Sequence, residues 1–189
     1  MNFKEQFATV DLILNTDIET KSVDAFALSL IKAEKQMRRI FTFLIFQNPS
    51  YNISHYKQLR ATLANNRNVY LEGFIRGIDI IMPRDLKAIY GEDYDGDIAK
   101  FVLYSRDRNK IFHGQITEQG LEREDLIDRV NDIKKWCEHL GVEIKKEIGY
   151  DGFSQSYKKS PIILTLNNLD RFDTIAKYSA FLEAEIRRR

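Results

Sequence analysis

The stretch from residue 21 to residue 47 constrains the fold most, because its apolar residues recur at steps of three and four along its whole length. They are Val23, Phe26, Leu30, Ala33, Met37, Ile40, Phe41, Leu44 and Ile45. This spacing places them on one face of an α-helix and predicts one long amphipathic helix. Asn48-Pro49 ends it, because proline disfavours helical backbone in the residue before it. The whole chain has only 3 prolines and 9 glycines, so further long helices are expected.

The same periodicity predicts helices over most of the remaining chain. The expected helices span residues 3–14, 54–82, 84–90, 96–114, 122–148 and 168–186. A strand over 9–14 is the alternative for part of the first helix, and Asn65-Asn66 is a candidate break in the second. The apolar stripe of 122–148 keeps its phase through Gly141, so we expect one helix there. Residues 149–167 are rich in Gly, Ser and Lys before the β-prone PIILTL, which indicates an irregular arm or a single strand.

We therefore expect an all-α fold, a helical bundle of long antiparallel helices with a short irregular or single-strand arm near 150–167. Residues 1–189 are expected to form a single domain, with a core at 20–148 and a C-terminal arm and helix at 149–189. A chain of 189 residues has the usual size of one domain, and hydrophobic residues at 43% suffice for its core.

The net charge argues against recognition of nucleic acid by overall charge. It is only +1, so any contact with RNA must come from a local basic patch or from two subunits that combine theirs. Cys137 is the only cysteine, which rules out an internal disulfide and suits a reducing compartment. The start, MNFKEQF, lacks the layout of a secretion signal, and the longest apolar run is far too short for a membrane span. We expect a cytoplasmic protein without membrane contact.

The segment RNKIFHG, residues 108–114, distinguishes this chain from an ordinary bundle. On an α-helix, Asn109 and His113 lie four residues apart and therefore on one face. Arg108 lies about 140° around the helix axis from His113, an angle that the long arginine side chain can span. One helix end can therefore present a guanidinium, an amide and an imidazole to a single cleft.

These three groups suit cleavage of an RNA phosphodiester by its own 2′-hydroxyl. The reaction needs a base with a pKa near neutrality, which His113 supplies as general base or acid. It also needs a fixed cation for the charge that develops on the phosphate, and the fork of Arg108 matches phosphate oxygens. Asn109 would orient the histidine or a phosphate oxygen. The expected products carry a 2′,3′-cyclic phosphate and a 5′-hydroxyl, and no metal or other cofactor is required.

The residues RNKIFH also resemble the R-N-x-x-x-H form of the R-x(4–6)-H motif of HEPN domains. The segment comes late on one expected helix and is followed by a glycine, a linker and a second long helix, an architecture similar to that family's over residues 20–148. The resemblance implies a homodimeric endoribonuclease of toxin–antitoxin or antiphage defence systems, in which two motifs form one site. It assigns the catalytic positions to Arg108, Asn109 and His113. It further implies an RNA substrate, with tRNA among the candidates, and an antitoxin or defence-system partner protein.

One departure from the family concerns regulation. In the subset that a nucleotidyltransferase antitoxin silences, a tyrosine follows the histidine by two positions. Gln115 occupies that position here. Regulation by tyrosine modification is therefore not expected.

Further cations are candidates for substrate contact. Lys110 and Arg106 flank the motif, and Lys158 and Lys159 lie on the arm. The rings of the arm (Tyr150, Phe153 and Tyr157) are of the kind that stacks on unpaired bases. Glu34 and Lys35 would reach the cleft if the first long helix packs beside the motif. His55, His139 and Cys137 lack the spacing of a zinc site, and we expect no metal.

Two alternative interpretations of the motif remain. In the first, Arg108 and His113 only bond carbonyls at a helix end or pair with acids such as Asp107 or Glu118. In the second, the chain is a non-catalytic module that holds a nucleotide or RNA for a partner protein.

Overall fold

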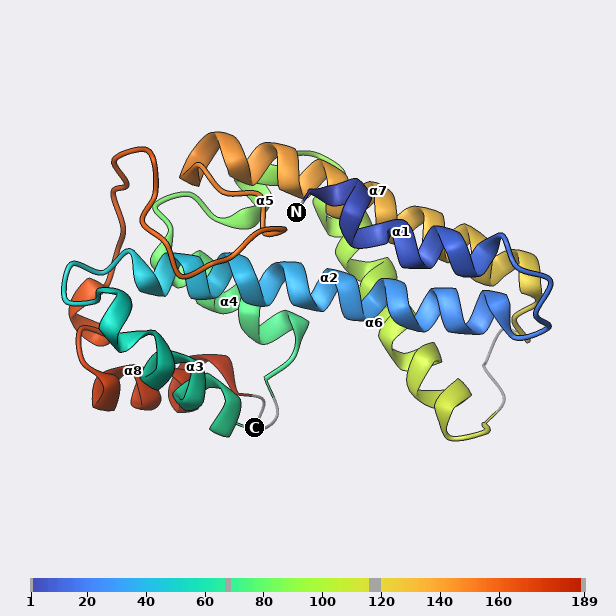
Figure 1. The fold of residues 1–189 in the computed structure, drawn as a ribbon, viewed down its shortest axis with the longest axis horizontal. Coiled ribbons are helices and arrows are strands. Elements are labelled where there is room, and N and C mark those ends of the chain that lie inside the picture. The colour runs from blue at the N-terminus through green and yellow to red at the C-terminus, as the bar shows by residue number, and fades with distance from the viewer. Residues whose placement is uncertain (1, 67–68, 116–119, 188–189) are drawn as a thin grey trace.

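The computed structural model describes residues 2–66, 69–115 and 120–187, and these form an all-α bundle as predicted (Figure 1). No strand occurs among the described residues. The arm near 150–167 is therefore irregular, the first of the two forms expected from the sequence. The elements in chain order are α1 (Phe3–Leu14), α2 (Lys21–Phe46), η1 (Ile53–His55), α3 (Tyr56–Asn65), α4 (Leu71–Ile81), α5 (Leu86–Tyr90), α6 (Tyr94–Phe112), α7 (Arg123–Ile148), η2 (Leu169–Arg171), α8 (Ile175–Phe181) and the π-helical turn η3 (Leu182–Ile186).

The long helix α2 runs through the middle of the molecule, with α1 and α7 on one side of it (Figure 1). Helix α1 runs antiparallel to α2, as expected of neighbours joined by a short loop. Helix α7 instead runs parallel to α2. Near their first residues, Arg123 bonds the carbonyl of Glu19, and halfway along them Gln36 Nε2 donates to the carbonyl of Cys137 at 2.9 Å. The parallel direction is possible because four helices intervene between the two in sequence.

Helix α4 packs on the other side of α2 and is held there by the last turn of the chain. The rings of Phe41 and Phe74 lie 5.6 Å apart between α2 and α4. Gly73 and Gly77 turn their bare backbone toward Ile186 of η3. A Cβ atom at Gly73 would lie only 2.2 Å from the carbonyl oxygen of Ile186. The glycines therefore permit an approach that a larger residue would block.

The arm at 149–167 covers the C-terminal half of α2. Tyr150 stacks on Phe43 with ring centroids 4.5 Å apart, and both rings are buried. Gly149 and Gly152 have φ of 72° and 82°, the left-handed region that lets the chain reverse directly after α7. The arm is thus irregular but tightly packed, with its first aromatic rings in the core.

Three helices differ from the predictions in where they begin, end or divide. The single helix expected over 54–82 is two helices, α3 and α4, and the break follows Asn65, where a candidate interruption had been identified. Helix α6 begins at Tyr94, inside an acidic segment that resembles a loop, because Asp95 and Asp97 favour a helix N-terminus. The final helix is divided into η2, α8 and η3.

Helix α6 crosses beneath α2 and is anchored by polar contacts on its inner face (Figure 1). Tyr104 donates to Asp132 of α7 at 2.7 Å. Asp107 forms an ion pair with Arg129 of α7, with both residues buried at 3% and 6% exposure. The guanidinium of Arg129 also lies 4.7 Å from the centre of the Tyr104 ring. These contacts fix the rotation of α6 and so determine which way Arg108, the next residue, faces.

Among the described residues, every helix is either too short or too polar to cross a membrane.

Candidate active site

The motif predicted from the sequence occupies the last turn of α6 and the residue that ends it. His113 is the C-cap of α6, and Gly114 follows with a φ of 66°. The amides of Gly114 and Gln115 donate back to the carbonyls of Ile111 and Lys110 at 3.0 and 2.8 Å. This is the Schellman arrangement, which satisfies carbonyls at a helix end. Gly114 therefore ends the helix directly after the motif and leaves His113 exposed on its final turn.

Arg108 is held between two oxygen acceptors. Its Nη1 donates to Glu34 Oε1 of α2 at 3.3 Å, and its Nε and Nη2 donate to Asn109 Oδ1 at 3.3 and 3.2 Å. Its side chain is 17% exposed. In the alternative interpretation of the motif, Arg108 or His113 would pair with acids such as Asp107 or Glu118. Asp107 pairs with Arg129 instead, and Glu118 lies outside the described residues. Asn109 therefore orients Arg108 in this structure. The sequence had predicted that Asn109 would orient His113 or a phosphate oxygen.

A cavity of about 240 Å³ opens beside this arginine between α2, α4 and α6. Its walls include Arg106, Arg108 and Asn109 from α6, and Glu34 from α2. Tyr70, Leu71, Glu72, Phe101, Val102 and Ser105 complete the walls. Two arginines and two glutamates thus face the same space, so their formal charges cancel. Of the two residues that would reach the cleft if α2 packed beside the motif, Glu34 lines this cavity and Lys35 does not.

His113 and Lys110 do not belong to the walls of this cavity. His113 lies one turn beyond Asn109 on the same helix face, as the spacing predicted, and is open to solvent. Lys110 is half-buried and lies next to Asn109 in sequence. The structure therefore brings Arg106, Arg108 and Asn109 to one cavity and leaves His113 outside its walls, one turn further along α6.

The two lysines predicted on the arm lie far from the motif. Lys159 Nζ donates to the carbonyls of Phe46 and Asn48 at 2.7 and 3.1 Å and so caps the C-terminal end of α2. Lys158 Nζ lies 5.2 Å from the centre of the Tyr150 ring. Glu34 and Phe46 are separated by about 18 Å along α2, at 1.5 Å per residue. One cavity cannot contain both sets of predicted residues.

The aromatic rings of the arm differ in their availability. Tyr150 and Phe153 are buried at 2% and 4% exposure and cannot stack on a base. Burial raises the pKa of the Tyr150 hydroxyl above its ordinary range. Tyr157 is only half-buried and lies against Tyr56 with ring centroids 5.2 Å apart. Of the three predicted stacking residues, only Tyr157 keeps an accessible face.

Sequence reasoning missed a group of cations on the outer face of α2 and on α3. Lys35, Arg38, Arg39 and Arg60 line two adjoining cavities near Tyr157. The signal was present as K-x-x-R-R on the polar face of the predicted long helix, but Arg60 comes from another element. Among the described residues, no group of three or more His, Cys, Asp or Glu is arranged to hold a metal.

Comparisons of this chain with protein-family models, with curated proteins and with solved structures found no match.

Proposed function

We propose that this protein is a metal-independent endoribonuclease that uses the last turn of α6. The observation that carries the proposal is the fixed position of Arg108 at the wall of an open cavity, with Asn109 bonded to its guanidinium. His113 follows one turn later on the solvent-exposed side of the same helix. A guanidinium, an amide and an imidazole within two turns are the groups that cleavage by a 2′-hydroxyl requires.

In the proposed reaction, the ribose 2′-oxygen attacks the adjacent phosphorus and loses its proton to a base. The bond from phosphorus to the 5′-oxygen breaks, and that oxygen takes a proton from an acid. The products are a 2′,3′-cyclic phosphate and a 5′-hydroxyl. His113 serves as base or acid, and Arg108 stabilises the negative charge on the phosphate oxygens. Arg106 and Lys110 add positive charge near the leaving strand.

A homodimer would supply both proton-transfer groups, because each copy contributes one His113. The resemblance of RNKIFH to the HEPN motif supports this arrangement.

Three exposed apolar side chains also lie near the motif or its cavity. Tyr70 is 45% exposed and lines the cavity, while Phe112 and Ile31, at 62% and 49%, lie one turn from Arg108 and Glu34. Burial of these exposed side chains against a second chain would be favourable. Phe112→Asp should therefore reduce the mass measured by light scattering from dimer to monomer.

The biological role that we propose is that of a toxin or antiphage defence effector in the cytoplasm, acting on RNA such as tRNA and restrained by a partner protein. The resemblance of the motif supports this role. Expression of the wild-type chain should arrest growth, and expression of His113→Ala should not. Equal growth in both cases would remove this role.

The direct test incubates the purified protein with RNA in the presence of EDTA and analyses the new ends. We expect 2′,3′-cyclic phosphates, and a loss of rate of at least about a hundredfold in His113→Ala, the usual contribution of a general acid or base. Arg108→Ala should lose a similar factor. His55→Ala and Arg84→Ala are matched controls, because both residues lie outside the cavity. Full activity in His113→Ala, with normal folding, would refute the proposal.

A second candidate function is RNA or nucleotide binding without turnover. One observation favours it: the guanidinium of Arg108 is already engaged by Glu34 and Asn109, and His113 does not line the cavity. Under this hypothesis, RNA binds in a saturable manner, and no cleavage occurs at any protein concentration. Glu34→Gln would then strengthen binding, since it removes one negative charge from the cavity.

A further inference from the structure

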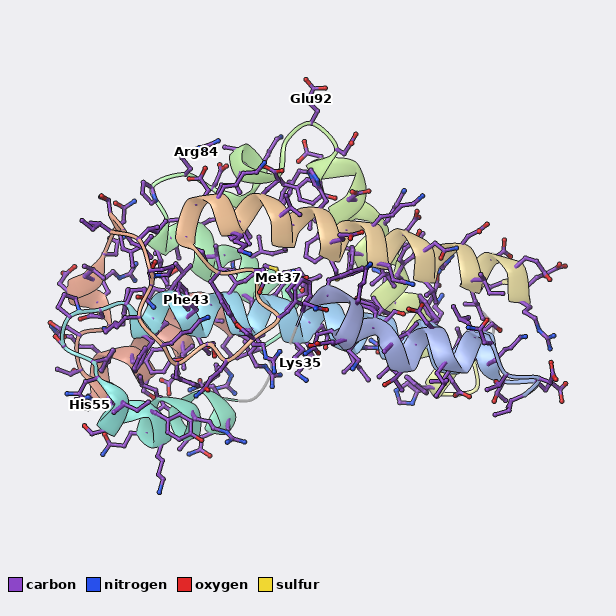
Figure 2. The ribbon with its side chains drawn as sticks, turned by 45° about the horizontal axis from the view of Figure 1, so that its top comes forward. Lys35, Met37, Phe43, His55, Arg84 and Glu92 are labelled. Carbon is purple, nitrogen blue, oxygen red and sulfur yellow. The ribbon has the colours of Figure 1, made fainter. Side chains whose placement is uncertain are left out.

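The outer face of α2 carries a second cationic surface that the proposed cleavage site does not use. Two cavities, of about 470 and 510 Å³, share Arg38, Arg39, Arg60, Ser156 and Tyr157 in their walls and therefore form one groove. Lys35 lines the second cavity. We call this surface the arginine groove. It lies between α2, α3 and the arm, and Figure 2 shows Lys35 at the edge of α2 nearer α3.

The charge of the arginine groove is uncompensated. Four cations line it, and none of the described residues in its walls is acidic. By contrast, the cavity beside Arg108 holds as many glutamates as arginines. In a chain of net charge +1, this is a concentration of positive charge at one place. The pKa of Lys35 is lowered by burial and then by the neighbouring charges of Arg39 and Lys32, which is consistent with a positive local field.

The guanidinium groups of the groove are held by neutral partners. Arg39 Nη1 donates to the carbonyl of Phe153 at 2.5 Å, and Arg60 Nη1 donates to the hydroxyl of Tyr56 at 3.3 Å. Arg38 lies 5.8 Å from the centre of the Phe74 ring. Because no carboxylate of the described chain satisfies these groups, their charge and most of their donors remain available to a ligand. Because these side chains are already held in place, less conformational entropy is lost when a ligand binds to them.

The chemistry of the groove favours a nucleic acid strand over an isolated anion. Arginine forks match phosphate oxygens, and three of them along one groove suit successive phosphates. The rings of Tyr56 and Tyr157 meet edge to face at the same groove and offer surfaces on which unpaired bases stack. A duplex would present its phosphates but not its base faces to these rings.

The arginine groove also lies next to the candidate active site. Arg38 is one turn beyond Glu34 on α2, a rise of about 6 Å. Glu34 lines the cavity beside Arg108, and Arg38 lines the groove. Just before α4, the neighbouring residues Val69 and Tyr70 line the groove and the cavity, respectively. A strand in the groove can therefore continue toward Arg108.

We propose that the arginine groove binds single-stranded RNA through its phosphates and bases, beside the point of cleavage. The proposal rests on the proposed ribonuclease function for its choice of RNA. Arg38, Arg39 and Arg60 hold the backbone, and Tyr157 stacks on a base. The groove thus acts in substrate binding and takes no part in the chemical step.

The test measures binding of a short fluorescein-labelled single-stranded RNA by fluorescence anisotropy over a range of salt concentrations. The variant is Arg38→Ala with Arg60→Ala, since neither guanidinium bonds the backbone and the fold should survive. The matched control is Arg84→Ala with Arg123→Ala, which removes equal charge from exposed residues outside the groove. Figure 2 shows Arg84 on the side of the molecule away from Lys35.

We expect the groove variant to bind at least about tenfold more weakly. The slope of log Kd against log salt should fall by about 1.4, since each lost phosphate contact on a single strand changes it by about 0.7. The control should bind as the wild type does. Equal affinity and equal slope in the groove variant would overturn the proposal. Inorganic polyphosphate that competes as well as RNA, per phosphate, would also overturn it in favour of a bare polyanion.

The outcomes also separate this proposal from the cleavage function. If the wild type cuts RNA and the groove variant cuts with unchanged KM, the groove proposal fails and the ribonuclease stands. If RNA binds through the groove and no cleavage occurs, the ribonuclease fails and the groove stands. With both proposals correct, the groove variant has a raised KM and a nearly unchanged kcat at saturating RNA.

Discussion

Removal of the Asp107 carboxylate should destabilise the fold strongly, because its partner Arg129 is a buried cation. The two residues are 3% and 6% exposed and join α6 to α7. Breaking a buried ion pair by removing one partner costs about 3–5 kcal/mol, since the remaining charge stays desolvated. Arg129 keeps the Tyr104 ring at 4.7 Å, so we expect the lower end of this range for Asp107→Ala.

A loss of about 3 kcal/mol in a chain of this size corresponds to a fall in Tm of roughly 6–12 °C. Urea denaturation followed by circular dichroism measures the free energy of unfolding directly. Asp107→Leu combined with Arg129→Met removes both charges and keeps apolar volume, so this double variant should recover most of the lost stability. Lys177→Ala provides the surface comparison, because its pair with Asp173 is exposed and should contribute below about 1 kcal/mol.

The reasoning is wrong if Asp107→Ala loses less than about 1 kcal/mol, or if the double variant is less stable than the single one. Either result would mean that the buried guanidinium of Arg129 is stabilised without the Asp107 carboxylate. The rotation of α6 would then be fixed by its other contacts, such as the hydrogen bond from Tyr104 to Asp132.

Three further predictions concern other parts of the fold. Gly73→Ala should lose about 1–3 kcal/mol in urea denaturation despite alanine's better helix propensity, because its Cβ would overlap the Ile186 carbonyl; a gain in stability would contradict this packing. Burial raises the pKa of Tyr51 to about 12, so the stability that its neutral hydroxyl contributes is complete below pH 10 and is lost as the pH rises toward 12. Tyr51→Phe should weaken this alkaline loss of stability, and it also removes a buried hydroxyl without a partner among the described residues. An unchanged alkaline melting profile in this variant would exclude Tyr51 as the cause. Cys137 is fully buried and its pKa is raised, so its thiol should react with a disulfide reagent only as fast as the protein unfolds; rapid labelling of the native protein would contradict its burial.

The long helices could be predicted from the sequence because each carries its own periodic apolar stripe. Helix α7 continues through Gly141 as its apolar stripe predicted. The glycine lies close to Phe153, and a Cβ atom there would be only 2.9 Å from the ring. The break between α3 and α4 follows Asn65, at the Asn65-Asn66 pair that the sequence marked as a candidate interruption. The start of α6 was missed because its first turn is acidic, a composition shared by loops and helix N-termini.

Only part of the candidate site could be predicted from the sequence, because some of its contacts join distant segments of the chain. The spacing of Arg108, Asn109 and His113 along one helix is a local property and follows from helix geometry. The contact between Arg108 and Glu34 depends on how α6 crosses α2, which no local pattern specifies. The arginine groove likewise combines α2, α3 and the arm, whose residues lie far apart in the sequence. Contacts of this kind depend on tertiary packing.

The close packing of Ile186 on α4 has a consequence for the order of folding. Ile186 lies against Gly77, so the position of α4 depends on residues far along the chain. Leu71 and Glu72, at the start of α4, form part of the wall beside Arg108. On the ribosome, these packing contacts of α4 can form only after residue 186 has been synthesised. A nascent chain that already carries the motif therefore still lacks part of the packing that supports this wall.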